Sequence, residues 1–432
     1  MLLIKNGHVI DPKSNKDETL DILIKDNHIV RIDNFIIEAE LPEDERNNLQ
    51  VIYADNLFVA PGLVDVHSHF RDPGFTYKED ILTGAKAAAK GGYTTVVLMA
   101  NTKPVVDNLE TLKYVTDKAS ETDIHVLTCA SITMGLQGKE LTDMDTLKNA
   151  GAVGFTDDGI PLMNDDIVIE AMKKAASLNV PLSFHEENPE LITNNGINHG
   201  KASEYYNIEG SPRAAEIDLI ARDLNYAETY NAIIDIQHIS TREGVELIRS
   251  KKAELQSKGM NNIHGEATPH HFSLTEEAVI ENGTLAKMNP PLRTEKDRLA
   301  IIEGLKDNTI DIIATDHAPH SADEKAKPIT EAPSGIIGLE TALSLGISNL
   351  VKAGHLSYLQ LIEKMTINPA KMYNLDCGYI AEGGPADLVI FNDKSYTVGK
   401  PVSKSTNSPF LGKQLDGEIL YTICDGKIVY QK

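Results

Sequence analysis

The sequence predicts an α/β protein, a decorated (β/α)8 barrel of the TIM type with a small β-sandwich domain formed by both chain termini. Two observations lead to this fold. Between about residues 57 and 374, short apolar runs alternate with longer helical patterns, as in a parallel sheet built from repeated βα units. The two ends instead carry short β-rich runs separated by turn residues. We therefore expect residues 1–56 and 375–432 to form one composite β domain and residues 57–374 to form the barrel.

The amino-terminal segment alternates strand-like runs with tight turns. Asn6-Gly7 and Asp26-Asn27 are turn pairs that each follow an apolar run. The carboxyl-terminal segment repeats this style, with Asp425-Gly426 between two strand-like runs. Neither end is long enough to bury a good core alone, so we expect the two ends to pair.

The central part contains eight candidate strands, the number that closes a barrel. Helical patterns separate them, for example over residues 77–90, 165–178, 211–230 and 242–252. A doubly wound open sheet is the alternative, but no Gly-x-Gly-x-x-Gly motif follows the first strand. The candidate strands are residues 57–67, 94–101, 124–130, 152–158, 181–185, 233–238, 264–268 and 311–316.

The composition excludes several classes of protein. With 41 Lys and Arg against 64 Asp and Glu, the 432 residues carry a net charge of −23, which argues against nucleic acid or an anionic membrane surface as a partner. No apolar run approaches the ~18 residues of a membrane span, and the amino terminus does not resemble a signal peptide. The three cysteines are widely spaced, so we expect a reduced, cytoplasmic protein without disulfides.

Polar side chains end six of the eight expected strands. Because barrel active sites form at the carboxyl ends of the strands, these side chains should share one rim. Residues i and i+2 of a strand point to the same side, so His67 and His69 can meet one ion. Imidazole together with carboxylate suits zinc and leaves positions open for water. The strand-end residues are His67 and His69, Asn101, Asp158, His185, His238 and Asp316.

Two motifs connect the chain to a known family. Residues 67–74 read His-Ser-His-Phe-Arg-Asp-Pro-Gly, and residues 315–320 read Thr-Asp-His-Ala-Pro-His. With these motifs the chain resembles the dihydroorotases of the amidohydrolase superfamily over nearly its whole length. The resemblance implies a zinc-dependent hydrolase that reversibly cyclises N-carbamoyl-L-aspartate to L-dihydroorotate, with loss of water, in de novo pyrimidine biosynthesis.

The resemblance also implies roles for the strand-end residues. His67, His69 and Asp316 would bind one zinc ion, His185 and His238 a second, and Asp158 would bridge the two. The number of Zn2+ ions per chain, one or two, remains open, and we favour two. The fourth strand ends in Asp157-Asp158, and we favour Asp158 as the bridge because it directly precedes Gly159, where the family places this ligand.

The chemistry explains why these residue types are needed. Zinc lowers the pKa of bound water to ~7 and polarises a carbonyl, so a metal-bound hydroxide can attack the ring. Asp316 would then act as general base and, after proton transfer to the leaving nitrogen, as general acid. Arg71 is the natural fork for the substrate carboxylate. With the contacts that the resemblance adds, the expected substrate-binding residues are His69, Phe70, Arg71, Asn101, Asn289, His320, Ser334 and Gly335.

Some features leave alternatives open. The polar stretch 319–333 follows the last barrel strand and is either an active-site loop or a solvated connector. His270-His271 is expected to support the site rather than bind metal. Ala100 and Ser334 differ from the residues that the family usually has at these positions, and both lie next to expected substrate-binding residues.

Two other functions compete with this interpretation. A hydantoinase, dihydropyrimidinase or allantoinase would typically carry a carboxylated lysine bridge and lack the Phe-Arg-Asp-Pro-Gly run. A non-catalytic scaffold would be expected to lose ligands, whereas all six positions are filled here. For assembly we expect a homodimer, and an aspartate transcarbamoylase is a candidate partner.

Overall fold

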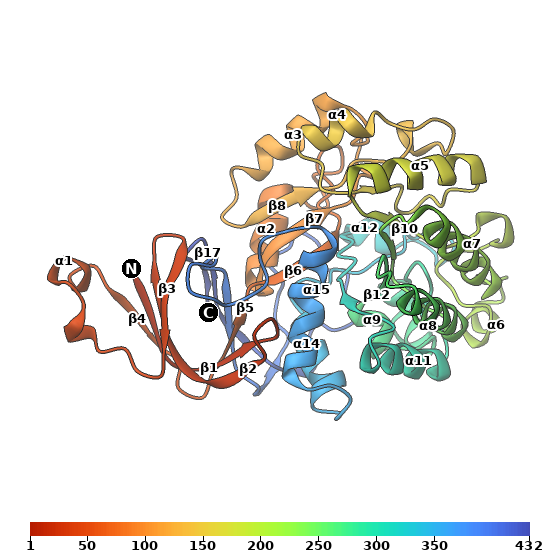
Figure 1. Ribbon diagram of the computed structural model, residues 1–432. Helices are drawn as coiled ribbons and strands as arrows, with labels where there is room; N and C mark the ends of the chain where they lie inside the picture. Colours follow the sequence, from red (N-terminus) through yellow and green to blue (C-terminus); the bar gives the residue numbers. More distant parts are fainter.

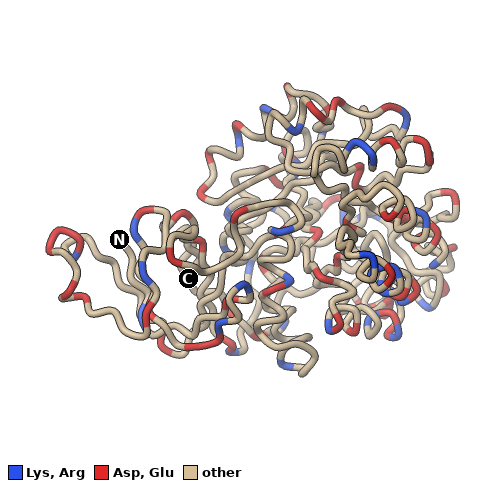
Figure 2. Tube along the Cα trace, in the orientation of Figure 1, with Lys and Arg blue, Asp and Glu red and all other residues tan.

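The protein has two adjoining regions, a barrel and a sheet made from both ends of the chain (Figure 1). These come from a computed structural model that describes residues 1–432. No helix is long and apolar enough to cross a membrane. Acidic positions are spread along both regions (Figure 2), in keeping with the net charge of −23.

The smaller region is an eight-stranded sheet. Its path runs β18-β17-β14-β5-β1-β2-β3, and β4 pairs with β1 off this path. Strand β5 pairs with both β1 and β14, so it joins amino-terminal to carboxyl-terminal strands as the sequence predicts. The strands are β1 Leu2–Asp11, β2 Lys16–Lys25, β3 His28–Asp33, β4 Gln50–Tyr53, β5 Phe58–Pro61, β14 Leu388–Phe391, β17 Ile419–Cys424 and β18 Lys427–Gln431.

The larger region contains eight parallel strands. They form two runs, β6-β7-β8 and β9-β10-β11-β12-β13. Parallel bridges from Ala130 to Phe155 and from Ser68 to His317 connect the two runs at both sides, which closes the barrel. The strands are β6 Leu63–Ser68, β7 Tyr93–Leu98, β8 His125–Thr128, β9 Phe155–Thr156, β10 Leu182–Phe184, β11 Ile234–Ile236, β12 Ile263–Ala267 and β13 Ile312–Ile313.

The first predicted barrel strand, residues 57–67, is two strands in the structure. Strand β5 gives its hydrogen bonds to the terminal sheet, and β6 pairs with β7 in the barrel. Between them, Gly62 donates its N–H to Asp387 O at 2.9 Å, and a Cβ at this glycine would collide with Thr94. An apolar run cannot reveal such a transfer between sheets, because both halves are buried. The division into residues 1–56 with 375–432 and 57–374 stays a prediction.

Most helices between barrel strands begin at a side-chain cap, and α7 is an exception. Helix α2 starts four residues later than the pattern over 77–90 predicts, because the Asp80 side chain accepts from Thr83 N. Helices α5 and α8 begin where the sequence predicts, and α7 starts just after the Ser-Pro pair. The barrel helices are α2 Ile81–Lys90, α3 Leu109–Ala119, α4 Met144–Asn149, α5 Asp165–Leu178, α7 Ala214–Tyr230, α8 Arg242–Ser257 and α11 Glu295–Lys306.

Short helices complete the chain. After β13, helices α14 and α15 pack against barrel strands, and α14 also contacts β1 (Figure 1). A hairpin of β15 and β16 follows, with residues 398–413 as its long loop. The remaining elements are α1 Glu43–Arg46, α6 Lys201–Tyr206, α9 Pro269–Ser273, α10 Glu277–Asn282, α12 Ala322–Lys325, α13 Ala342–Gly346, α14 Tyr358–Met365, α15 Ile367–Met372, β15 Ser395–Thr397 and β16 Gln414–Asp416.

The core explains why the two regions form one body. The main apolar cluster fills the barrel wall and includes Val389, Phe391 and Ile419 from the terminal sheet. A separate small cluster lies within the terminal sheet itself, around Ile4, Ile22 and Leu388. Strands β14 and β17 are therefore shared between the two cores, which fixes the terminal sheet against the barrel.

Candidate metal centre and active site

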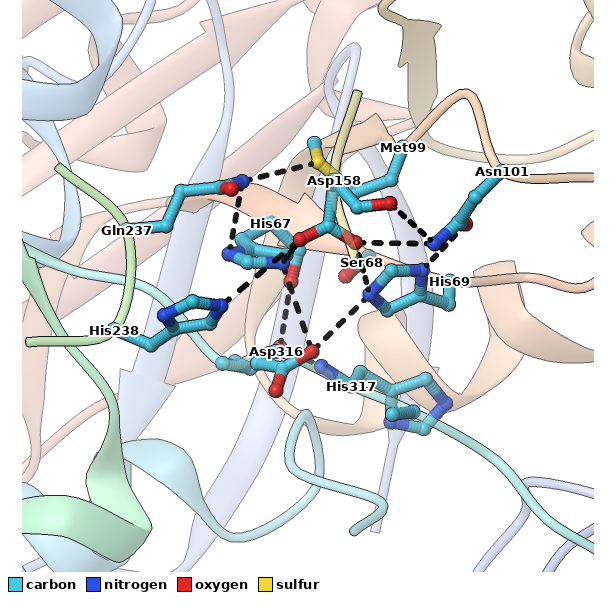
Figure 3. A network of polar contacts seen from close by, with 12 residues as sticks. His67, Ser68, His69, Met99, Asn101, Asp158, Gln237, His238, Asp316 and His317 are labelled. Carbon is cyan, nitrogen blue, oxygen red and sulfur yellow. Dashed lines mark hydrogen bonds and ion pairs between the residues drawn. The ribbon is translucent and has the colours of Figure 1, made fainter. Parts of the chain in front are cut away.

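Strand β6 delivers two imidazoles to the centre of the barrel mouth (Figure 3). His67 is fully buried, and its Nδ1–H donates to Glu266 Oε1 at 2.8 Å. Its Nε2 has no hydrogen-bond partner. That atom lies 3.4 Å from Asp158 Oδ1 and 3.6 Å from Asp316 Oδ1. A buried nitrogen that faces two carboxylates favours positive charge between them, either a proton on this nitrogen or a metal ion.

His69 repeats this arrangement on the same side of the strand. Its Nδ1–H donates to Asn101 Oδ1 at 3.0 Å, and the Asn101 amide donates to Asp158 Oδ2 at 3.1 Å. The outer nitrogen of His69 is therefore occupied, and Nε2 lies 3.4 Å from Asp158 Oδ2 and 3.1 Å from Asp316 Oδ1. Asn101 thus orients the imidazole and the carboxylate toward each other.

A second pair of imidazoles faces Asp158 from the opposite side. His185, directly after β10, and His238, after β11, bring Nδ1 and Nε2 to within 2.9 Å of each other. These two nitrogens lie 3.8 Å and 3.9 Å from Asp158 Oδ1. The six side chains His67, His69, Asp158, His185, His238 and Asp316 are called the rim cluster below.

The structure separates the two neighbouring aspartates. Asp158 points into the rim cluster, whereas Asp157 Oδ1 accepts from Ile132 N at 2.8 Å and Thr133 N at 3.0 Å. Burial raises the pKa of Asp157 to about 6. Burial also opposes ionisation of Asp158, but the facing imidazoles, His67 first, hold its pKa well below the usual range. Asp157 is therefore a structural carboxyl and Asp158 is the one placed to bind a cation.

Three residues of the site have a left-handed backbone. Arg71, His238 and Asp316 have φ values of 59°, 35° and 45°, a region that costs of order 1–3 kcal/mol for such residues and is concentrated at functional sites. At Asp316 the turn is fixed by the preceding residue, since Thr315 N and Oγ1 donate to Asp65 at 2.8 Å and 2.7 Å. The buried Asp65 therefore helps hold the Asp316 carboxylate over the cluster.

Several expected substrate residues lie beside the rim cluster. Arg71 Nε donates to Pro319 O at 3.3 Å, and its Nη2 lies 3.4 Å from His320 Nε2. Asn289 Nδ2 lies 3.4 Å from His185 Nε2. A Cβ on Gly335 would come within 3.2 Å of His320 Nε2, so the glycine permits a close approach. The Ser334 hydroxyl is buried without a hydrogen-bond partner.

Phe70 is placed differently from its neighbours. Its ring is 1% exposed, packs over Gly84 of α2 and stands edge-on to His317. The ring therefore packs against α2 and His317. The expectation that Phe70 binds substrate stays a prediction.

Comparison with known proteins gives the family. A model of dihydro-orotase-like proteins matches residues 56–244, and one of the amidohydrolase family matches residues 340–430. Curated dihydroorotases from Clostridioides difficile and Clostridium acetobutylicum are 56% and 55% identical over 431 and 434 residues, covering 100% of both chains in each case. One from Lactococcus lactis is 50% identical, covering 100% of this chain and 99% of the relative. The chain belongs to the dihydroorotase family.

Solved structures support the fold of this dihydroorotase-family chain. An L-hydantoinase (dihydropyrimidinase) from Arthrobacter aurescens matches with a TM-score of 0.87 at 25% identity, covering 100% of this chain and 96% of the other. A D-hydantoinase from a Thermus species matches with a TM-score of 0.84 at 24% identity, covering 99% and 95%. Together with the closed parallel barrel and the terminal sheet, these matches confirm the predicted fold class.

The rim cluster of this dihydroorotase-family barrel fits a bound metal. Within each of two groups, His67-His69-Asp158 and Asp158-His185-His238, the ligand atoms lie within 4.8 Å of one another. Both groups are buried, and Asp158 belongs to both. The unpartnered Nε2 of His67 adds a donor with no other function in the structure. The amidohydrolases are metal-dependent, and this chain has the donor set that such an ion requires.

Sequence reasoning missed Glu266 of β12. Its Oε1 accepts from His67 Nδ1 and, at 3.2 Å, from His238 N, so one carboxylate orients residues from both halves of the rim cluster. The available signal was a fully buried acidic residue next to the end of a short barrel strand. His270 and His271 lie outside both metal-type groups, and His271 Nε2 donates to Pro290 O at 3.0 Å.

Two lysine side chains hold the stretch 319–333 in place. It contains helix α12, and Lys325 of this helix donates to Pro333 O at 2.9 Å. Lys287 donates to Ile329 O at 2.8 Å and to Ala332 O at 2.7 Å. Burial lowers the pKa of Lys287 to about 8 and that of Lys325 to about 7. Closure of this stretch over a substrate stays a prediction.

Proposed function

We propose that this chain catalyses the reversible cyclisation of N-carbamoyl-L-aspartate to L-dihydroorotate, with loss of water. The observation that carries the proposal is that Arg71, two residues after His69 of the rim cluster, has its Nη2 3.4 Å from His320 Nε2. A guanidinium is suited to the carboxylate that both compounds carry. Asp316 and Asp158 act electrostatically on Arg71, so the carboxylate-binding and metal-binding halves of the site adjoin.

The proposed metal is zinc, with two ions that share Asp158. His67, His69 and Asp316 would hold one ion, and His185 and His238 would hold the other. Support comes from the two buried groups of imidazole and carboxylate atoms and from Asn101 and Glu266, which occupy the outer nitrogens of His69 and His67. Bound zinc would polarise the reacting carbonyl and lower the pKa of water to ~7.

The residues of the chain then carry the proton and hold the substrate. Asp316 lies 3.1 Å from His69 Nε2, and His67 and His69 hold its pKa below the usual range against the effect of burial. As a carboxylate it can accept a proton from the attacking water and deliver it to the leaving ring nitrogen. Burial and the neighbouring Arg71 keep the pKa of His320 far below its ordinary value, so His320 contacts the anion as a neutral imidazole.

The remaining substrate contacts follow from position. Asn101 and His320 are proposed on the same carboxylate as Arg71. Asn289 and the backbone at Ser334 and Gly335 are proposed on the ring amide, with backbone contact from Phe70. A cytoplasmic location is proposed as well, since all three cysteines are buried and unpaired. A homodimer and an aspartate transcarbamoylase partner remain expectations from the sequence.

A hydantoinase is the competing function because solved hydantoinases share this fold. The experiment is turnover of the purified, zinc-loaded chain with dihydroorotate, N-carbamoyl-L-aspartate and hydantoin, followed by absorbance of the ring amide. We expect interconversion of the first two and at least ~10²-fold lower kcat/KM for hydantoin, which lacks the carboxylate that Arg71 binds. Turnover of hydantoin alone, or no turnover with zinc bound, would overturn the proposal.

A further inference from the structure

The loop between β15 and β16 contributes buried polar side chains beside the active site. Within residues 402–408, here called the C-terminal strap, buried and exposed positions alternate. Ser403, Ser405 and Asn407 are 5%, 4% and 2% exposed, while Lys404 and Thr406 are exposed. These three inward-facing polar side chains, at alternate positions and far in sequence from the metal-binding motifs, need partners, since a buried polar group without one is costly.

All the hydrogen-bonding capacity of the Asn407 side-chain amide is used on the loop that carries His320. Its Oδ1 accepts from His320 N at 3.0 Å, and its Nδ2 donates to Ala318 O at 3.0 Å and to Gly335 O at 3.1 Å. The acceptor and both donors are thus used in one geometry, which also fixes which amide atom is oxygen. One side chain therefore ties together the two ends of the stretch that runs from residue 318 to 335.

The strap backbone adds to this link. Asn407 O accepts from Ile337 N at 3.1 Å, just beyond Gly335. A cavity of about 50 Å³, bordered by His317, Ile337 and Ser408, lies next to these contacts. Together with the backbone hydrogen bond from Ala318 N to Ile336 O at 2.7 Å, the hydrogen bonds of Asn407 hold the two loop ends next to each other.

The two serines act on neighbouring parts of the same wall. Ser405 Oγ donates to Lys78 O at 2.7 Å, and Lys78 Nζ lies 3.4 Å from His320 Nδ1. Ser403 Oγ donates to Glu79, whose Oε2 is 3.7 Å from His317 Nε2. His317 directly follows Asp316 (Figure 3). The strap therefore contacts the wall that carries His320, and it touches no member of the rim cluster.

We propose that Asn407 is a positioning residue for substrate binding, which acts by holding His320 and Gly335 at their mutual distance. The inference rests on the proposed function, because that function gives His320 and Gly335 their substrate. Asn407 contacts no member of the rim cluster, so its replacement should weaken substrate binding without releasing a metal ion held there. A displacement of ~1 Å in a substrate-holding group can cost about 10²-fold in rate.

The test is a double-mutant cycle on kcat/KM for dihydroorotate. Asn407→Ala and His320→Ala are each expected to lower kcat/KM about 10- to 100-fold, mainly through KM, with zinc content unchanged. If Asn407 acts through His320, the double variant should be no more than about 3-fold worse than His320→Ala. Thr406→Ala, an exposed strap position, is the matched control and should behave like the wild type.

Additive losses in the cycle, or wild-type KM in Asn407→Ala, would overturn the positioning role. If Asn407→Ala does not fold, Asn407→Asp takes its place, because it retains the acceptor for His320 N and loses both donors. It should then raise KM less than His320→Ala and leave zinc content intact, and equal KM to the wild type would contradict the proposal. An inactive wild type would instead refute the proposed function, so the two failures are distinct.

Discussion

Two regions of the molecule bring together side chains of the types that bind metals, and only one is organised to do so. The first is the rim cluster in the barrel mouth. The second lies where the barrel meets the terminal sheet and consists of His125, Asp387, Cys424 and Asp425, here called the junction cluster. In the junction cluster His125 Nε2 lies 3.2 Å from Asp387 Oδ2 and 3.8 Å from Asp425 Oδ1, distances close to those in the rim cluster.

The two clusters differ in which of their atoms already have hydrogen-bond or ion-pair partners. In the rim cluster His67 Nε2 is buried without a partner, while its Nδ1 is anchored by Glu266. In the junction cluster His125 is paired with Asp387, and its side chain and that of Asp425 are 38% and 52% exposed. Burial raises the pKa of the Cys424 thiol well above its ordinary value, which disfavours the thiolate that metals bind. Residue types alone therefore do not define a metal site.

The largest expected contrast is between two aspartates. Asp316→Asn should lower kcat for dihydroorotate about 10²- to 10⁴-fold, because it removes the proposed general base and a carboxylate of the rim cluster. Asp425→Asn, the matched change in the junction cluster, should leave kcat within about 2-fold of the wild type. Steady-state kinetics on both variants checks this. A comparable loss of kcat in Asp425→Asn would mean that the two clusters are not functionally distinct.

Glu266 should matter nearly as much as a ligand, although it touches no substrate. Glu266→Gln weakens the hydrogen bond from His67 Nδ1 and should lower metal affinity or activity about 10- to 100-fold, as for other partners of metal-binding histidines. Asp387→Asn makes the same change beside His125 and should leave metal affinity unaltered. Zinc titration against a competing chelator measures both. Unchanged affinity in Glu266→Gln would contradict its orienting role.

Replacing Arg71 tests the proposed substrate contact beside the rim cluster. Arg71→Ala removes a charged donor whose hydrogen bonds are worth about 1.5–3 kcal/mol, so KM for dihydroorotate should rise about 10- to 100-fold while zinc content stays constant. Arg249→Ala, which removes a surface ion pair with Asp307, is the control and should leave KM unaltered. Loss of zinc from Arg71→Ala would show that the residue supports the metal instead.

The smallest expected effect concerns the junction cluster and depends on pH. The hydrogen bond to Asp387 raises the pKa of His125 in the folded protein. The pair therefore adds stability below the unfolded histidine pKa of about 6.5, and this contribution is lost as pH rises through the folded pKa. His125→Gln should cost about 0.2–1 kcal/mol at pH ~5.5 and nothing at pH ~9. Urea denaturation at both pH values checks this, and an equal loss at both would contradict it.

Much of the site could be predicted because barrel geometry collects strand ends. His67 lies near the end of β6, and His185 and His238 come after β10 and β11. Parallel pairing of these strands brings the three side chains to one rim. Asp157 is held by the backbone at residues 132 and 133, while Asp158 belongs to both metal-type groups, and the choice of Asp158 as the bridging ligand stays a prediction. The residues that orient the site from distant parts of the sequence could not be predicted in this way.

Three features could not be predicted from local pattern. Glu266 lies within a strand, and only the closed barrel shows that its carboxylate reaches His67 across the interior. Asn407 lies 87 residues from His320 in sequence, in a loop without periodic apolar residues. The transfer of the chain from β5 to β6 at Gly62 was also hidden, because each half is a buried apolar strand.

The most direct test of the account is the metal content of three purified proteins, the wild type, Asp158→Asn and His125→Gln, measured by mass spectrometry of the elements after exhaustive dialysis. The account predicts that the wild type and His125→Gln retain the same amount of zinc per chain and that Asp158→Asn, which loses the carboxylate shared by both metal-type groups, retains less. Zinc that persists in Asp158→Asn, or that disappears in His125→Gln, would contradict the assignment of the metal to the rim cluster.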